Sequence, residues 1–186
     1  MNTTWLVILA IVIVAIVFGL VVLVRRRRSE SLRKHFGPEY KRTVDQYGNQ
    51  RKAEAELAAR EKRVRKLEIR SLAPEEQSRF AEAWKKTQAR FVDEPSQAVG
   101  EADGLVKEIM QARGYPVGDF EHRAADISVD HPNVVINYRA AHDIAARNNS
   151  GKATTEDLRQ ALVHYHSLFE ELLEPTEAAT RKEAAS

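Results

Sequence analysis

The chain of 186 residues contains no cysteine. This absence excludes disulfide bonds, thiol nucleophiles and Cys-ligated zinc or iron–sulfur sites, and it agrees with a domain in the cytoplasm. Glycine and proline are scarce, with 8 and 6 residues, and there is no glycine-rich phosphate loop, no Gly-x-Ser-x-Gly motif and no His-Glu-x-x-His motif. The sequence therefore predicts no enzymatic activity and no cofactor.

A long apolar run lies near the N-terminus. The segment from Trp5 to Val24 contains no charged residue, no proline and one glycine. At about 1.5 Å per residue a helix of this length matches the hydrocarbon core of a bilayer, which predicts a transmembrane helix over 5–24. A cleaved signal peptide would need basic residues before the run and a small-residue cleavage site after it, and the sequence has neither.

Four arginines, Arg25, Arg26, Arg27 and Arg28, follow the apolar run directly. The positive-inside rule places them on the cytoplasmic side, with the short N-terminus outside and Trp5 at the outer headgroup level. The expected location is the cell membrane, with a single pass and a cytoplasmic C-terminal domain.

Charge is distributed unevenly over the rest of the chain. Residues 25–72 hold 16 Lys and Arg against 7 Asp and Glu, a net charge of +9, whereas residues 73–186 hold 13 against 20, a net charge of −7. A basic segment beside a cytoplasmic leaflet is attracted to anionic lipid headgroups by about 1 kcal/mol per cation, within a Debye length. An anionic-lipid surface sensor built on the segment from Arg25 to Arg42 is therefore one candidate function. Nucleic-acid binding is disfavoured because the distal part is acidic and few aromatic residues lie among the basic ones.

Residues 25–72 read as basic juxtamembrane and stalk helices. Gly37-Pro38-Glu39 is typical of a helix start, and Phe36, Tyr40, Val44 and Tyr47 recur at helical spacing. This face fits either an amphipathic stretch at the membrane interface or a surface that packs on the domain. Residues 50–70 contain no helix breaker and predict a solvated stalk helix, which could pair as a short coiled coil through a thin apolar seam of Leu57, Val64 and Leu67.

Residues 73–174 predict a bundle of about five helices. Pro74 begins the first, Gly114 ends the second, Asp119 caps the third, and Thr154 with Asp157 has the spacing of a capping box at the last. Each helix carries one apolar face that must meet another, so the fold class is all-α. The tail, 175–186, is small and charged, which predicts disorder.

Aromatic residues supply the leading candidates for an interaction surface: Trp84, Phe91, Tyr115, Tyr138 and Tyr165. A groove lined by them would bind a protein partner or a second copy of the chain. Aromatic residues at helical spacing also form helix cores, which is the alternative reading. The resulting hypothesis is a membrane-tethered helical protein-interaction module.

A third candidate function is a divalent-metal-binding hydrolase or sensor. Asp119, His122, Asp126 and Asp130 are separated by 3, 4 and 4 residues, which places them on one helical face, and His131 follows immediately. Carboxylates and neutral imidazoles are suitable ligands for such a metal. The alternative is a solvated face on which Asp119 and Asp130 act as helix caps.

Several stretches together resemble an uncharacterised family of bacterial single-pass membrane-anchored proteins with a helical soluble domain. They are RRRRSESLRKHFGPEY, AEAELAAREKRVRKLEIR, ARFVDEP and RGYPVGDFEHRAADISVDHPNVVINYRAAHDIA. The likeness covers nearly the whole chain. It implies a bacterial membrane setting and brings no known activity, cofactor or catalytic residue.

Overall fold

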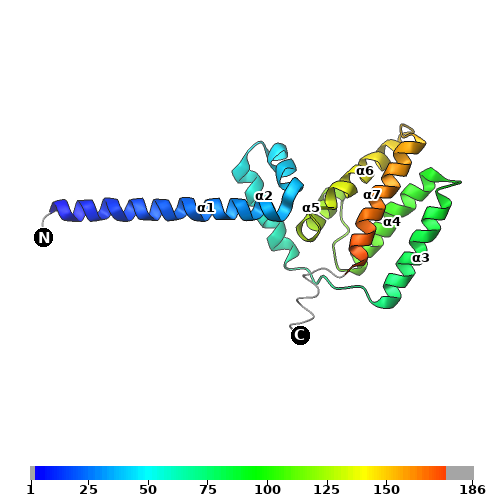
Figure 1. The fold of residues 1–186 in the computed structure, drawn as a ribbon, viewed down its shortest axis with the longest axis horizontal. Coiled ribbons are helices and arrows are strands. Elements are labelled where there is room, and N and C mark those ends of the chain that lie inside the picture. The colour runs from blue at the N-terminus through cyan, green and yellow to red at the C-terminus, as the bar shows by residue number, and fades with distance from the viewer. Residues whose placement is uncertain (1–2, 175–186) are drawn as a thin grey trace.

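The computed structural model describes residues 3–174, with side chains from residue 11 onward, and this part of the chain is entirely helical. Seven helices follow one another: α1 Thr3–Tyr47, α2 Gln50–Val64, α3 Pro74–Arg90, α4 Pro95–Ala112, α5 Phe120–Asp130, α6 Val135–Asn149 and α7 Thr155–Leu173. The first part of α1 projects alone from a body formed by all the other helices (Figure 1). The all-α prediction is confirmed, while the tail predicted to be disordered, 175–186, lies outside the described residues.

The five helices α3 to α7 form the predicted bundle. Helix α7 packs against α6 and α4, and α3 covers α4. The interior of the bundle is mainly apolar, and its fully buried side chains include Val106, Ile109, Leu168 and Leu172. Burial of these faces is the main stabilising contribution to the bundle.

Local capping chemistry sets the helix ends where the sequence predicts them. The Thr154 and Asp157 side chains form a reciprocal capping box at α7, and the Asp119 carboxylate accepts the His122 backbone N–H at 3.1 Å at the start of α5. Helix α6 begins at Val135, and no side chain caps its N-terminus.

Helix α1 changes direction at Gly37. This residue has φ 48° and ψ −122°, and a helix resumes at Pro38, as the sequence predicts for Gly37-Pro38-Glu39. Only glycine adopts such a conformation without strain. We refer to residues 3–36 of α1 as the shaft, and to residues 38–47 with α2 as the hairpin, because α2 runs back beside this part of α1.

The prediction that residues 50–70 form a solvated stalk helix is wrong. Helix α2 ends at Val64 rather than at residue 70, and it packs against α1 and α5 instead of standing in solvent. Leu57 and Val64 are buried in the core together with Leu32 and Phe36 from α1. The apolar seam is therefore used within the chain, and a coiled coil through it is excluded while the fold is intact. Of the two readings of the face that begins at Phe36, packing on the domain is observed for Phe36 and Tyr40, whereas Tyr47 is exposed.

Residues 65–73 form an irregular segment that crosses the end of α4. The Arg70 backbone N–H donates to the Arg113 carbonyl at 3.0 Å. Gly114 lies so close that a Cβ atom there would be 2.5 Å from the Glu68 carbonyl oxygen, and its φ is +95°. A glycine is thus required where the segment passes α4.

Within the described residues, no helix has the length and apolar character needed to cross a membrane. Part of the predicted span, residues 5–10, including Trp5 at its outer end, has side chains outside the described ones. The structure therefore does not support the predicted transmembrane helix.

Candidate functional site

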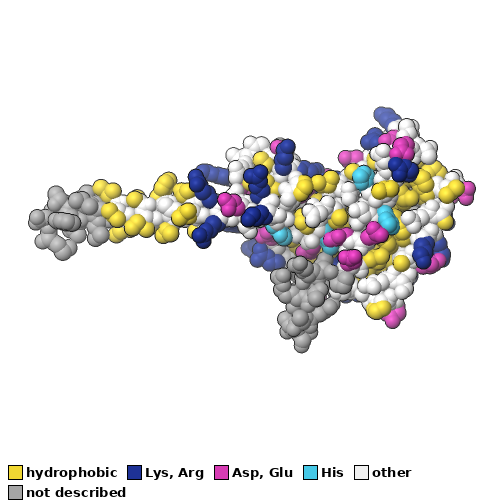
Figure 2. Space-filling model, in the orientation of Figure 1, with side chains coloured by type: hydrophobic (Ala, Val, Ile, Leu, Met, Phe, Trp, Pro, Cys, Tyr) yellow, Lys and Arg dark blue, Asp and Glu magenta, His cyan; other side chains and the backbone are white. Residues whose placement is uncertain are grey.

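The described surface of the shaft is apolar up to residue 24. Exposed Ile, Val, Leu and Phe side chains surround it over residues 11–24, and Phe18 is the most exposed, at 70%. A large apolar surface outside the core of a protein marks a contact with another molecule or with lipid. This surface ends abruptly at Arg25 (Figure 2).

Basic side chains follow at once. Arg25, Arg26, Arg27, Arg28, Arg33 and Lys34, which we call the collar, are all exposed. In the space-filling view dark blue side chains gather where the shaft meets the body (Figure 2). The collar therefore lies between an apolar surface on one side and the folded body on the other.

A carboxylate of α2 fixes the end of the shaft to the hairpin. The Glu54 Oε1 atom accepts hydrogen bonds from Ser29 Oγ at 2.6 Å, from the Tyr40 hydroxyl at 2.8 Å and from Gln50 Nε2 at 2.8 Å. Partial burial acts to raise the pKa of Glu54, but the hydrogen bonds from Ser29, Gln50 and Tyr40 together lower it. Glu54 is thus held as an anion that joins the shaft, the hairpin bend and α2.

A second carboxylate joins the hairpin to the bundle. Glu39 is fully buried and accepts from Arg60 Nη1 at 3.1 Å and from Arg139 Nη2 at 2.9 Å. Arg42 lies 3.6 Å from the same Oε1 atom. Glu121, on the solvent side, binds Arg139 at 2.8 Å and Arg42 at 3.7 Å. This Glu39 cluster connects α1, α2, α5 and α6.

Two further polar contacts involve α5, one to the hairpin and one within the bundle. Arg63 of α2 binds the buried Asp126 of α5, with Nη2 2.6 Å from Oδ1, and Arg123 Nε donates to the Tyr138 hydroxyl at 3.0 Å. Taking such charges out of water costs free energy that their attraction roughly offsets. Buried ion pairs therefore add little net stability, but they permit only arrangements in which every partner is matched.

The residues of the predicted metal face do not converge on one point. Asp119 binds His122, with 2.5 Å between Oδ2 and Nδ1, whereas Asp126 binds Arg63. Within residues 3–174 no three His, Asp or Glu side chains lie close enough together to hold a metal ion. Arg63 neutralises the one buried carboxylate of this face, which helical spacing alone could not reveal.

The other two candidate ligands have partners in a different part of the molecule. The Tyr115 hydroxyl donates to Asp130 Oδ2 at 2.6 Å, and His131 Nδ1 lies 3.1 Å from Glu171 Oε1. Since the Glu171 carboxylate only accepts, the neutral His131 ring donates through Nδ1. We therefore do not propose a metal site.

The predicted aromatic groove is also wrong. Trp84, Tyr115, Tyr138 and Tyr165 are buried, and only Phe91 is partly exposed. The Trp84 ring stacks on Phe169, with 4.6 Å between ring centroids. Burial raises the pKa of Tyr138 and of Tyr165. These rings hold the helices together, which was the alternative reading of their spacing.

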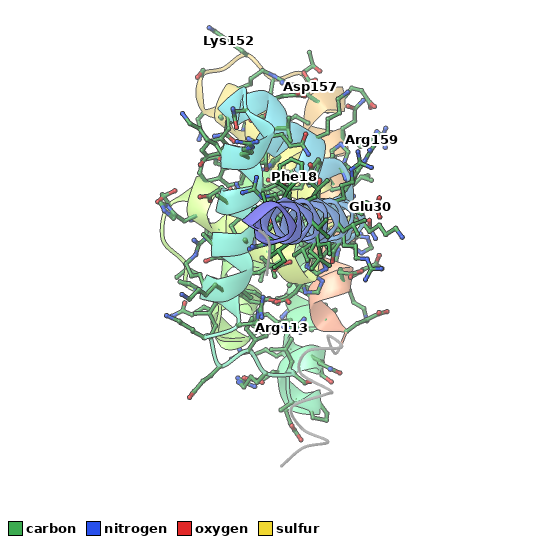
Figure 3. All side chains as sticks on the ribbon, turned by 90° about the vertical axis from the view of Figure 1, so that its left-hand side faces the viewer. Phe18, Glu30, Arg113, Lys152, Asp157 and Arg159 are labelled. Carbon is green, nitrogen blue, oxygen red and sulfur yellow. The ribbon has the colours of Figure 1, made fainter. Side chains whose placement is uncertain are left out.

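Arg113 performs a structural task at the end of α7. Its side chain is fully buried, and Nη1 donates to the Leu172 and Glu174 carbonyls at 2.9 and 3.0 Å. Cationic donors at a helix C-terminus satisfy the last carbonyls and favour the negative end of the dipole. The view along the shaft places Arg113 below it, on the side where the chain leaves α7 (Figure 3).

Sequence reasoning missed Glu54 and Arg139, and it assigned Glu39 only to the start of a helix. Arg60 gave one usable signal, because it shares a helical face with the buried Ala53, Leu57 and Val64. A cation on an apolar face predicts a buried partner, although it does not identify the partner.

Comparisons with protein-family models, with curated proteins and with solved structures found no match. The resemblance to a family of bacterial membrane-anchored proteins therefore stays a prediction. The candidate site is the connection between the shaft and the bundle, which consists of the collar, the Glu54 contacts and the Glu39 cluster.

Proposed function

We propose that this protein is a membrane-tethered helical interaction module whose bundle lies on the cytoplasmic face of a cell membrane. Residues 5–24 would anchor it, and the outer surface of the bundle would bind a partner protein. The apolar sequence of 5–24 and the exposed apolar side chains of 11–24 support the anchor. The four arginines that follow support the orientation.

One observation carries the proposal, namely the absence of any linker between the apolar segment and the folded body. Helix α1 continues from Thr3 into the core, where Leu32 and Phe36 are buried. Ser29, one residue after the last collar arginine of the run, is already bound to Glu54. A flexible tether would leave the bundle free to turn, whereas this joint gives it one orientation relative to the shaft.

The charge of the bundle suggests the chemistry of its partner. Residues 73–186 carry a net charge of −7, and like charge on an anionic membrane surface would keep that region away from the lipid. A partner with a basic contact surface therefore fits best, since complementary potentials speed encounter and exclude partners of like charge.

The test is proximity labelling of the full-length protein in its native membrane, with the labelling enzyme fused after Ser186. A defined set of cytoplasmic proteins should be enriched. A matched variant carries a flexible Gly-Ser insertion between Val24 and Arg25, which leaves the collar, the Glu54 contacts and the Glu39 cluster unchanged. If a fixed orientation matters, the same proteins should lose enrichment in this variant.

Two outcomes contradict the proposal. Extraction of the protein from membranes by alkaline carbonate would show that residues 5–24 do not anchor it. Labelling of proteins outside the cell would reverse the assigned orientation.

A further inference from the structure

We propose that the collar is a binding site for the headgroups of anionic phospholipids, which it gathers around the shaft. This inference rests on the proposed function, because it requires the shaft to stand in a bilayer. It adds a lipid partner to the protein partner proposed above.

The cations of the collar encircle the shaft. Successive residues of an α-helix are rotated by about 100°, so four consecutive arginines point to all sides of the shaft. Helix α1 is continuous through Arg25 to Arg28, and all four side chains are exposed. The cations therefore form a ring rather than a stripe, and the ring can contact lipid on every side of the shaft.

The charges of the collar are available to other molecules. No ion pair to any collar residue occurs among the described residues. Burial acts to raise the pKa of Glu54, and the nearby Arg28 adds to the hydrogen bonds given above, which together lower it. Most arginines beyond the collar do form ion pairs: Arg42, Arg60, Arg63, Arg65, Arg70, Arg90, Arg139, Arg147 and Arg159. The only acid of residues 25–34 is Glu30, which the view along the shaft places at its side (Figure 3). The six collar cations thus leave a net charge of +5.

The collar is held in a fixed position relative to the folded body. The Ser29–Glu54 hydrogen bond and the burial of Leu32 hold the base of the shaft against the hairpin. The collar therefore cannot bend back to reach the acidic bundle of its own chain. Beyond Glu30 and the nearby Glu54, its charge must be balanced by groups outside the molecule, and in a bilayer such groups lie where the apolar surface stops, at residue 24.

In a bilayer that position is the headgroup layer. A helix whose apolar surface ends at Val24 places Arg25 to Arg28 among the phosphates. Arginine forms forked, charge-assisted hydrogen bonds with phosphate oxygens. Anionic headgroups should therefore exchange with zwitterionic ones at the collar in favour of the anionic species.

The test uses the full chain reconstituted into nanodiscs of phosphatidylcholine and phosphatidylglycerol. Spin-labelled versions of each lipid report the fraction held at the protein. We expect phosphatidylglycerol to be enriched at least about fivefold over phosphatidylcholine, the factor that a single cation near an anionic surface supplies. The ratio should fall towards one at about 0.5 M salt, because added salt shortens the distance over which the collar attracts anionic headgroups.

Two quadruple variants make the test specific. R25Q/R26Q/R27Q/R28Q should lose the enrichment, whereas R79Q/K85Q/K86Q/K152Q, which removes four exposed cations from the bundle and its loops, should keep it. An equal ratio for both lipids around the inserted wild-type protein would overturn the lipid proposal and leave the anchor intact. Failure of the chain to enter nanodiscs at all would instead overturn the proposed function.

A second copy is the other possible source of acidic groups. If the collar variant abolishes a dimer in detergent and leaves the lipid ratio unchanged, the collar binds the acidic bundle of another chain, and the lipid proposal is wrong.

Discussion

The interior of the bundle and the joint between hairpin and bundle are held together by different forces. Leu168 and Phe169 lie among apolar side chains, where contacts are non-directional and small shifts are tolerated. At the joint, Glu39 is surrounded by Arg60 and Arg139, and every partner must be in place. The difference separates two properties of the molecule: apolar burial determines how stable the bundle is, and the ionic contacts determine how the hairpin sits on it.

Removing an apolar group from the bundle should have the largest effect. Phe169→Ala should lower the free energy of unfolding by about 3–5 kcal/mol, because it empties a buried site beside Trp84. Denaturant unfolding followed by helical circular dichroism measures the loss. Val163→Ala, on the exposed side of the same helix, should stay within about 0.5 kcal/mol. Equal effects of the two substitutions would show that the ring of Phe169 is not a core contact.

Breaking the ionic contact between hairpin and bundle should destabilise the hairpin by about 3 kcal/mol and leave the rest of the bundle intact. Glu39→Gln leaves the guanidinium groups of Arg60 and Arg139 without their shared anion, and removal of one partner from a buried ion pair is strongly destabilising. Hydrogen exchange should accelerate in α2 and stay unchanged in α7. Glu121→Gln, which touches Arg139 from the solvent side, should have a much smaller effect.

A compensated variant sharpens the same comparison. Glu39→Leu with Arg60→Met and Arg139→Leu removes all the buried charges of the contact and should recover most of the lost protection. If the single and triple variants exchange equally fast, the charges do not position the hairpin.

The bend at Gly37 should contribute about 1–2 kcal/mol. Gly37→Ala places a side chain at φ 48°, a conformation that costs about this much in backbone strain. Gly100→Ala is the matched control, since Gly100 is helical and has open space around it. That change should stabilise the protein by about 0.5–1 kcal/mol. Thermal unfolding of both variants decides the sign, and a stabilising Gly37→Ala would refute the strained bend.

Protonation of His131 at acidic pH should lower the stability of the folded protein, and this is the smallest of the expected effects. Burial lowers the pKa of His131, although the hydrogen bond from its ring to Glu171 acts in the opposite direction; the nearby Arg113 cation lowers it further and Asp130 raises it. The unfolded chain, with a pKa of about 6.5, then binds protons more readily than the folded one. The stability that the buried, neutral His131 contributes is fully present above about pH 6.5. It is lost as the pH falls through the lower pKa of His131 in the folded state.

The check is the unfolding temperature between pH 7.5 and 5. It should fall with pH in the wild-type protein and fall less steeply in His131→Gln. A slope remains because burial also lowers the pKa of His142. Identical slopes in the two proteins would show that His131 is not the group responsible.

Helix boundaries were predictable where the chemistry is local. Asp119 and Thr154 cap their helices, and Gly37 begins a new helical segment before Pro38, because each signal acts within a few residues of itself. The number of bundle helices was predictable for the same reason. The joint was not, because Glu39 meets Arg60 and Arg139 across 21 and 100 residues of sequence.

The role of the aromatic residues could not be predicted from the sequence. Their periodicity fits both a core and a binding groove, and only the packing of α3 against α7 decides that Trp84 is interior. Likewise, the carboxylate spacing from Asp119 to Asp130 is the same whether or not Arg63 neutralises Asp126. A pattern on one helix fixes which residues share a face, but not what that face meets.

The position of the shaft limits how closely the shafts of two copies can approach each other. Seen along its axis, the rest of the protein extends beyond the shaft both above and below it and to either side (Figure 3). Two helices that pack along their length bring their axes within about 8–10 Å of each other. Two intact copies with parallel shafts would overlap in their folded bodies before reaching that separation. The folded bodies of two such copies would therefore meet before their parallel shafts could pack along their length.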